Sequence, residues 1–240
     1  SGGITSSNRP VHLEWWDQGY KLIRRATIFI DNLKDSKKLD SSFVKTRIAE
    51  ARFLRAFSYF ALVKRYGGVP LITRVQQITD PDDELYPDRN KEQEIYDFIL
   101  SECDLCINDL PSSYSDVDLG RVSKNAARAL QCRAALYAAS IAEFGEVNLD
   151  GLVGIPAEFG EDYYQIAYDT ANQIIGSNRF SLYEKHADKK ENFQKIFLDE
   201  NNSETIFAVR HVGSSWWVSS FWIYDFSQCP KNAWGAGNKD

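Results

Sequence analysis

The sequence predicts a mainly α-helical protein of irregular helix pairs, followed by a loop-rich, aromatic-rich segment with minor strand content. Apolar residues recur at steps of three and four along most of the N-terminal three quarters of the chain, which is the period of an amphipathic helix. Helix starts near residues 12 and 42 are followed by starts near 90 and 123, so a helix pair recurs after about 80 residues. Regular tetratricopeptide units measure about 34 residues. The expected fold is therefore an irregular, tetratricopeptide-like solenoid.

The first helix is predicted from the clearest apolar stripe in the chain. Its members share one face of a helix over about residues 12–34: Leu13, Trp16, Tyr20, Ile23, Thr27, Ile30 and Leu33. Because Trp16 lies on this stripe, we expect Trp16 and its neighbour Trp15 to belong to the core.

The second helix has a strong stop signal. It ends at Tyr66, because Gly67-Gly68 favours a left-handed cap and Pro70 cannot continue a helix. Residues 53–63 leave almost no polar face. This pattern predicts a central helix that is covered on several sides.

The second helix pair follows a long polar loop at residues 76–89, a length typical of functional or mobile loops. Asn90 and Gln93 form a capping-box pattern that opens a third helix, which runs to about Leu110. A fourth helix is predicted from Ser123 to Phe144. Its alanines would allow a neighbouring helix to approach closely; they are Ala126, Ala127, Ala129, Ala134, Ala135, Ala138, Ala139 and Ala142.

The chain changes character after a fifth predicted helix at about residues 162–175, which ends at Gly176. Alternating apolar residues at 204–210 predict the core of a strand. Residues 212–240 are rich in Trp, Ser, Gly and Asn and have no helical period. We therefore expect a tetratricopeptide-like helical domain over residues 1–179 and a loop-rich region over residues 180–240, packed together as one structural unit.

The charge balance argues against nucleic-acid binding. The chain holds 28 Lys and Arg against 34 Asp and Glu, a net charge of −6, so phosphate contacts would need a local basic patch. The charge is unevenly spread along the chain: residues 1–75, which form a basic end, hold 14 Lys and Arg against 6 Asp and Glu. This basic end is interpreted either as solvated helix faces or as a docking surface for an acidic partner.

The sequence also lacks a membrane-spanning segment. The richest apolar run, at residues 53–63, is interrupted by Arg55, and no window reaches the roughly 18 apolar residues that a membrane helix needs. The chain opens on Ser1 without a methionine, which we interpret as a cut end.

No local pattern indicates catalysis or a bound cofactor. The motifs GxSxG, HExxH, GxGxxG and the Walker A loop are absent, and the three histidines, at 12, 186 and 211, are isolated. Cys103 and Cys106 have a metal-like spacing, but they fall on the apolar stripe of a predicted helix, where cysteine packs as a small hydrophobe. We expect no catalytic residue, no cofactor and no metal, and core packing is favoured over metal or redox use of this pair.

Aromatic residues near the C-terminal end are the strongest signal for binding. Trp216, Trp217, Trp222, Tyr224 and Trp234 lie in a segment whose Ser, Gly and Asn content argues against deep burial. An indole face is apolar and matches the C–H-rich face of a sugar ring, while nearby amide and guanidinium groups pair with hydroxyls. The alternative for each ring is packing at the edge of the helical domain.

A long motif in the second helix resembles the SusD/RagB family. Residues 49–73, AEARFLRAFSYFALVKRYGGVPLIT, are similar to the family's hallmark helix and Gly-Gly-Val-Pro turn. The same resemblance extends to Gly-Arg-Val-Ser at 120–123 and to Asn-Ser-Glu-Thr-Ile-Phe at 202–207, and it covers about residues 8–210. It also includes the spacing of four residues in the first helix, Trp16, Tyr20, Ile23 and Asn32. Members are usually much longer, so we expect an internal portion that lacks the extreme N-terminus and the C-terminal half.

The resemblance implies a non-catalytic, surface-exposed lipoprotein of the Bacteroidetes outer membrane. Such proteins capture an oligosaccharide or polysaccharide for a SusC-like TonB-dependent transporter, and they are anchored by an N-terminal lipid, which here would lie before residue 1. The family's glycan site is assembled from loops that correspond to residues 4–10 and 212–234. By chemistry we choose Asn8, Arg9 and the five C-terminal aromatic residues as ligand-binding residues.

Two alternative functions stay open from the sequence. A peptide-capturing member of the same family would share the helical part, and an intracellular tetratricopeptide adaptor would lack a signal peptide and lipobox upstream of Ser1. Calcium binding by residues 80–84 also stays open, because this stretch offers oxygen ligands without a recognisable loop pattern.

Overall fold

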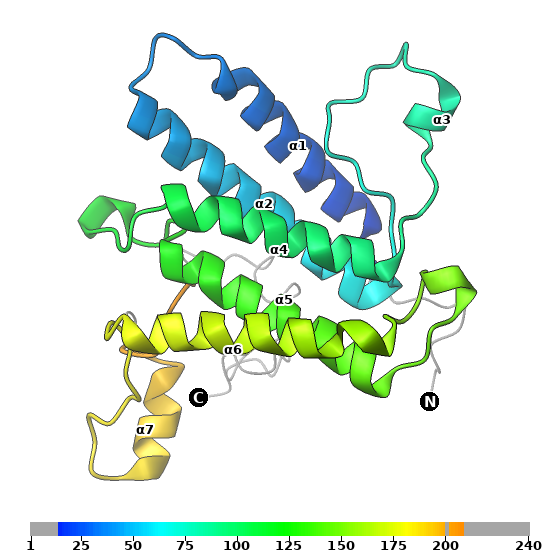
Figure 1. Ribbon diagram of the computed structural model, residues 1–240. Helices are drawn as coiled ribbons and strands as arrows, with labels where there is room; N and C mark the ends of the chain where they lie inside the picture. The colour runs from blue at the N-terminus through cyan, green and yellow to red at the C-terminus, as the bar shows by residue number, and fades with distance from the viewer. Residues whose placement is uncertain (1–13, 200–201, 209–240) are drawn as a thin grey trace, which may run out of the picture. The chain divides into compact units, whose positions relative to one another are not determined.

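The computed structural model describes residues 14–199 and 202–208. The chain divides into two compact units, one spanning Trp15–Asn178 and the other made of Ser1–Glu14 and Arg179–Asp240. The first unit contains five long helices: α1 (Trp16–Lys34), α2 (Ser41–Tyr66), α4 (Glu92–Asp109), α5 (Lys124–Phe144) and α6 (Gly160–Gly176). A short α3 (Asp82–Leu85) interrupts the loop between α2 and α4 (Figure 1).

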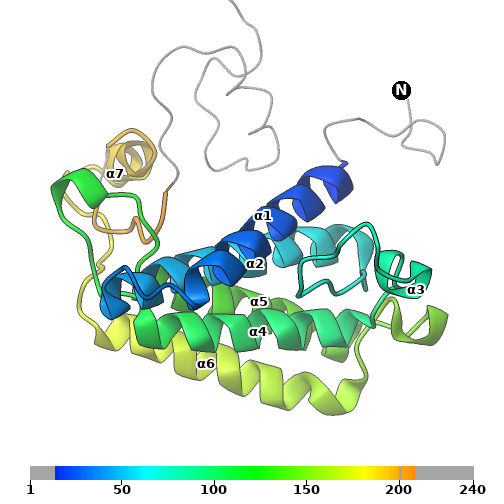
Figure 2. The ribbon, with the colours of Figure 1, turned by 90° about the horizontal axis from the view of Figure 1, so that it is seen from above.

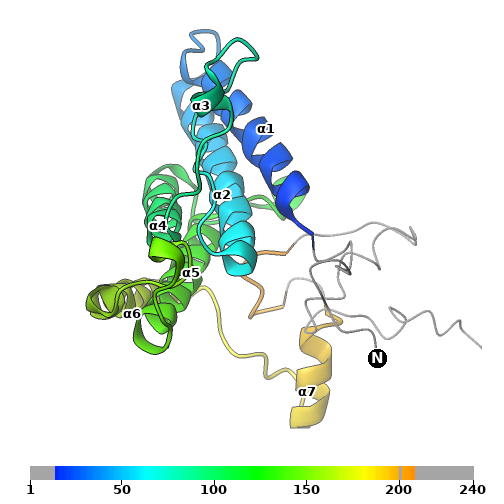
Figure 3. The ribbon, with the colours of Figure 1, turned by 90° about the vertical axis from the view of Figure 1, so that its right-hand side faces the viewer.

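The five long helices stack in chain order, as the helix-pair pattern predicts. α1 packs on α2, α2 on α4, α4 on α5 and α5 on α6, and Figures 2 and 3 show these helices as successive layers. The prediction of a mainly α-helical, tetratricopeptide-like stack is confirmed. Within the described ranges, no helix is both long and apolar enough to cross a membrane.

α2 lies between α1 and α4, so it is covered on several sides, as its apolar sequence predicts. Nine of the 11 residues at 53–63 are not exposed, whereas Leu54 and Phe57 reach solvent. α1 approaches so closely that a methyl group at Gly19 would lie 2.9 Å from Leu62. The side chain of Asp40 caps the helix start by accepting from the backbone N–H groups of Ser42 and Phe43.

Cys103 and Cys106 are core residues of α4, as expected. Both are fully buried, and the Cys106 thiol donates to the carbonyl oxygen of Ala49 at 3.1 Å. Burial raises the pKa of Cys106 to about 12, so the thiolate that binds metals or attacks disulfides is disfavoured. Across the described ranges, no cluster of three or more His, Cys, Asp or Glu side chains is arranged to hold a metal.

α5 is an inner helix whose small residues permit close packing. Seven of the eight predicted alanines are buried; the exception is Ala129. The helix ends at Phe144, as predicted, and Gly145 follows it. Ser123 caps the helix start by accepting from the N–H of Ala126 at 3.3 Å.

The predicted capping box of α4 is wrong by one position. Glu94, not Gln93, reaches back to accept from the N–H of Lys91 at 3.1 Å. Asn90 is used instead to hold the preceding segment, because its side-chain oxygen accepts from the N–H of Leu71 at 2.9 Å. The amide nitrogen of Asn90 also donates to Glu94 at 2.9 Å, so Asn90 connects the segment after α2 to the start of α4.

A tight loop after α5 explains the Gly-Gly-Val-Pro turn. Asn148 and Val153 form an isolated antiparallel bridge, and the intervening Leu152 carbonyl accepts from the N–H of Gly68 at 2.7 Å. Gly67 has φ +67°, and a Cβ there would lie 2.4 Å from that same carbonyl oxygen. Only glycine lets the end of α2 and this loop approach each other so closely.

A buried ionic cluster connects α1, α2 and α4. Glu102 accepts from Nε and Nη2 of Arg55 at 2.9 and 2.7 Å and from Arg52 at 2.6 Å. The remaining Arg55 nitrogen, Nη1, donates to the hydroxyl of Thr27 at 3.3 Å and to the carbonyl of Thr73 at 3.4 Å. Arg55, which interrupts the apolar run of α2, is therefore a buried charge with its donors paired.

The predicted strand at 204–210 is wrong within the residues that the structure describes. Residues 202–208 contain no strand. Asn202 instead forms a turn, because its side-chain oxygen accepts from the N–H of Glu204 at 2.9 Å, while the Glu204 carboxylate accepts from the N–H of Tyr183 at 2.8 Å. Alternating side chains favour a strand only where a partner strand completes the hydrogen bonds.

The second unit contains a helix that the sequence pattern did not predict, α7 (Lys189–Ile196). Asp188 caps its start by accepting from the N–H of Lys190 at 2.9 Å. The side chain of Asn192 holds the preceding loop, because it accepts from the backbone N–H of His186 and donates to the carbonyl oxygen of His186. A helix of eight residues is too short for a periodic pattern to identify it.

Candidate functional site

The ligand-binding residues chosen from the sequence lie outside the described residues. They are Asn8, Arg9, Trp216, Trp217, Trp222, Tyr224 and Trp234. The described part of the chain nevertheless contains a surface groove with binding chemistry, which lies beside the first turns of α1.

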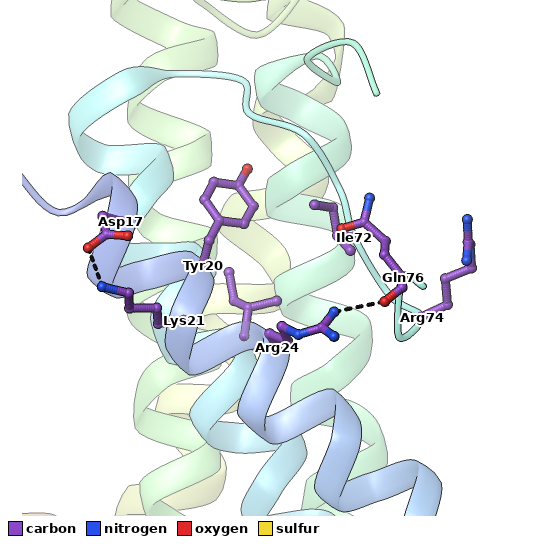
Figure 4. A pocket seen from close by; sticks show the side chains of 8 residues that line it. Asp17, Tyr20, Lys21, Arg24, Ile72, Arg74 and Gln76 are labelled. Carbon is purple, nitrogen blue, oxygen red and sulfur yellow. Dashed lines mark hydrogen bonds and ion pairs between the residues drawn. The ribbon is translucent and has the colours of Figure 1, made fainter. Parts of the chain in front are cut away.

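This groove has a volume of about 230 Å³ and lies between α1 and the segment that follows α2. Its lining residues are Asp17, Tyr20, Lys21, Ile23, Arg24, Ile72, Arg74 and Gln76 (Figure 4). This volume is below the roughly 300–1,000 Å³ of typical small-molecule pockets.

Aromatic rings surround the start of α1 next to the groove. The Trp16 ring lies 5.2 Å from Tyr20 and 5.3 Å from Tyr66, measured between ring centroids. Trp16 is 39% exposed, so the prediction that it is a core residue is wrong. Its ring lies against the rings of Tyr20 and Tyr66. The close contact between α1 and α2 is made by Gly19 and Leu62 instead. Trp15 is half-buried.

Tyr20 forms the apolar wall of the groove together with Ile23 and Ile72. Its hydroxyl donates to the carbonyl oxygen of Pro70 at 2.7 Å. Burial raises the pKa of Tyr20 far above its ordinary value of 10.0, so the hydroxyl stays neutral. The hydrogen bond fixes the ring on the turn that ends the Gly-Gly-Val-Pro motif.

Two cationic side chains on α1 lie along the groove one turn apart. Lys21 pairs with Asp17 at 2.6 Å, and both side chains are largely exposed. Arg24 donates through Nη1 to the backbone carbonyl of Gln76 at 3.0 Å. Arg24 therefore connects α1 to the opposite wall of the groove, as Figure 4 shows.

The opposite wall is held in place by hydrogen bonds within the loop at residues 74–85. Arg74 pairs with Asp80 at 2.7 Å and also with Glu84. The hydrogen bonds from Gln77 and Arg74 lower the pKa of Asp80. The Gln76 side chain donates to the carbonyl oxygen of Glu84 at 2.5 Å. The loop that the sequence predicts as functional or mobile is thus held by its own hydrogen bonds and ion pairs, which give the groove a preformed wall.

The groove could not be predicted from the sequence, because its two walls, at residues 17–24 and 72–76, are separated by about 50 positions. The only local signals were the Asp17–Lys21 pair at helical spacing and the long polar loop. The groove offers apolar walls, an acceptor at Asp17 and several N–H donors, which is the chemistry of hydroxyl-rich or charged ligands.

Comparisons with known proteins agree with this fold. Residues 4–136 match the SusD-like family model described as "Starch-binding associating with outer membrane". SusD-like protein P38 of Formosa agariphila is 32% identical over 123 residues, which are 51% of this chain and 23% of that protein. SusD-like protein P25 of the same organism is 26% identical over 196 residues, which are 81% of this chain and 31% of that protein.

Solved structures show the same similarity. A SusD-like protein from Bacteroides fragilis superposes with a TM-score of 0.70 and 26% identity, over 88% of this chain and 36% of that one. A laminarin-binding SusD-like protein superposes with a TM-score of 0.64 and 25% identity, over 84% of this chain and 39% of that one. The chain thus spans less than two fifths of the length of each of these relatives. Since the family model matches more than half of the chain, the chain belongs to the SusD-like family.

Proposed function

We propose that this protein is a non-catalytic glycan-binding protein of the cell surface, which captures an oligosaccharide or polysaccharide and delivers it to a SusC-like TonB-dependent transporter. The single observation that carries this proposal is the match of residues 4–136 to a family described as starch-binding and associating with the outer membrane. The similarity to a laminarin-binding protein supports a carbohydrate ligand.

The ligand-binding residues in this proposal are those that the sequence chemistry selects. Asn8 and Arg9 precede α1 in the sequence and supply polar side chains for hydroxyls, whereas Trp216, Trp217, Trp222, Tyr224 and Trp234 supply flat apolar faces. The protein would be a surface-exposed lipoprotein of the outer membrane, held by a lipid on an N-terminal segment that precedes Ser1.

Replacing Trp222 and Trp234 by alanine should weaken glycan binding by about 1–3 kcal/mol for each ring that stacks on a sugar. The full-length protein is first screened against neutral and acidic glycans and against peptides, and the ligand found is then titrated by calorimetry. Tyr168→Ala is a matched control, because Tyr168 is an exposed ring on α6. Unchanged titrations for the double variant reject these two rings as contacts, and retention of peptides alone contradicts a glycan ligand.

Exchanging Lys37, Lys38 and Lys45 for glutamate should weaken association with the transporter by roughly tenfold at low salt. All three lysines are exposed around the turn between α1 and α2, in the basic N-terminal part of the chain. Co-purification of the transporter with each variant measures the effect. A triple variant with the same charge change at Lys185, Lys189 and Lys190 is the control. Equal association of both variants removes the electrostatic part of the docking proposal.

A further inference from the structure

We propose that the groove beside α1 binds a sugar unit that carries a carboxylate or a sulfate group, so that this protein prefers acidic glycans over neutral ones. This inference rests on the proposed function and adds the class of glycan to it. The anionic group would bind at Arg24.

Among the described residues, the ion pairs at the groove leave one of its cations without a carboxylate partner. Three of its four charged lining residues are cationic, namely Lys21, Arg24 and Arg74. The single lining carboxylate, Asp17, is already paired with Lys21 at 2.6 Å. Two further carboxylates, on Asp80 and Glu84, hold Arg74 from the loop and are not part of the lining.

Within the described ranges, Arg24 is the lining cation that lacks a carboxylate partner. Among the described residues, its hydrogen-bond acceptor is the backbone carbonyl oxygen of Gln76, which takes one donor of Nη1. A guanidinium has five N–H donors in a planar fork that matches carboxylate and sulfate geometry. The remaining donors are therefore available to a ligand. The hydrogen bond to Gln76 holds the guanidinium at the wall of the groove in the absence of a ligand.

The remaining walls suit a sugar ring rather than a free inorganic anion. Tyr20, Ile23 and Ile72 give an apolar surface for the C–H face of a pyranose. Tyr20 is fixed by its bond to Pro70, and Arg74 by Asp80 and Glu84, so little side-chain entropy is lost on binding. The groove thus places an apolar wall, which can contact the ring of an acidic sugar, beside Arg24, which can bind its anionic group.

The test compares three oligosaccharides by calorimetry on the full-length protein: an oligogalacturonate, a sulfated galactan oligosaccharide and a neutral laminarin oligosaccharide. We expect at least one acidic probe to bind about tenfold more tightly than the neutral probe, with an affinity that falls as salt rises. The two acidic probes distinguish a carboxylate from a sulfate ligand.

Arg24→Gln should weaken binding of the preferred acidic probe by about 10- to 100-fold, the usual value of hydrogen bonds to a charged group. Binding of the neutral probe should not change. Arg25→Gln is the matched control, because Arg25 is the next residue, is exposed and does not line the groove. Arg24→Lys keeps the charge and removes the fork, so it should recover only part of the affinity. Thermal unfolding of each variant checks that the fold is intact.

The outcomes separate this inference from the proposed function. Equal affinity for acidic and neutral probes, or equal effects of Arg24→Gln and Arg25→Gln on the acidic probe, overturns the inference and leaves glycan capture standing. Failure of the protein to bind any glycan in the wider screen overturns the proposed function and the inference with it.

Discussion

Replacing Glu102 by alanine should lower the free energy of unfolding by about 3–5 kcal/mol, the usual cost of removing one partner from a buried ion pair. Glu102 is 3% exposed and Arg55 is 5% exposed. Without the carboxylate, Arg55 would keep a buried positive charge with the weaker contacts to Thr27, to Thr73 and to the ring of Phe98. Urea unfolding of the variant measures the loss.

An exposed ion pair gives the control for this substitution. Asp31→Ala removes the partner of Lys34 on the surface of α1, where neither side chain is buried, and should change stability by less than about 1 kcal/mol. A double variant, Arg55→Met with Glu102→Leu, should recover much of the loss, because apolar side chains of similar size often replace a buried pair without cost. If Glu102→Ala lowered the free energy of unfolding by no more than Asp31→Ala does, the buried ionic cluster would not stabilise the fold.

Replacing Gly68 by alanine should destabilise the protein by about 3 kcal/mol, at the upper end of what overpacking costs. The new methyl group would lie 2.0 Å from the carbonyl oxygen of Asn90 and 3.0 Å from the backbone nitrogen of Glu92. Both are backbone atoms at the start of α4, so no side-chain rotation relieves the clash. The turn after α2 would have to move away from α4, which a lower midpoint of thermal unfolding would report.

Gly176→Ala is the matched control for Gly68→Ala. Gly176 is the last residue of α6, and no other atom lies within 4 Å of a Cβ added there. Alanine at that position should be neutral or stabilise the helix by up to about 1 kcal/mol, because glycine has the higher conformational entropy in the unfolded chain. If Gly68→Ala were as stable as Gly176→Ala, the close approach of the two backbones would be contradicted.

The helices were predicted best where a period and its end signals agreed. α2 ends at Tyr66, and α5 starts after Ser123 and ends at Phe144, as their caps indicate. The structure departs from the prediction where two local signals competed or where a partner was required. The capping box closes between Lys91 and Glu94, while Asn90 accepts from the N–H of Leu71 and donates to Glu94. Residues 202–208 form turns without a strand.

The candidate groove could not be predicted, whereas the family could. The motif at residues 49–73 is contiguous in sequence, so the order of residues alone identifies it. The groove joins Arg24 to Gln76 across 52 positions, and no local pattern reports such a contact. Trp16 illustrates the same limit, since its position on the stripe indicated burial, and its exposure depends on how closely α1 approaches α2.

The amino-acid sequence by itself determined the helix-pair architecture, the covering of α2 on several sides, the glycine turn and the family. These features depend on the spacing of apolar residues and on backbone preferences of single residues, which are local properties. Only the tertiary structure decided which charges became paired. Arg55 is matched by Glu102, whereas Arg24 has no carboxylate beside it in the part of the chain that the structure describes. The physical reason is that the energy of a charge depends on what other segments bring within a few ångströms of it, and on how much water remains there.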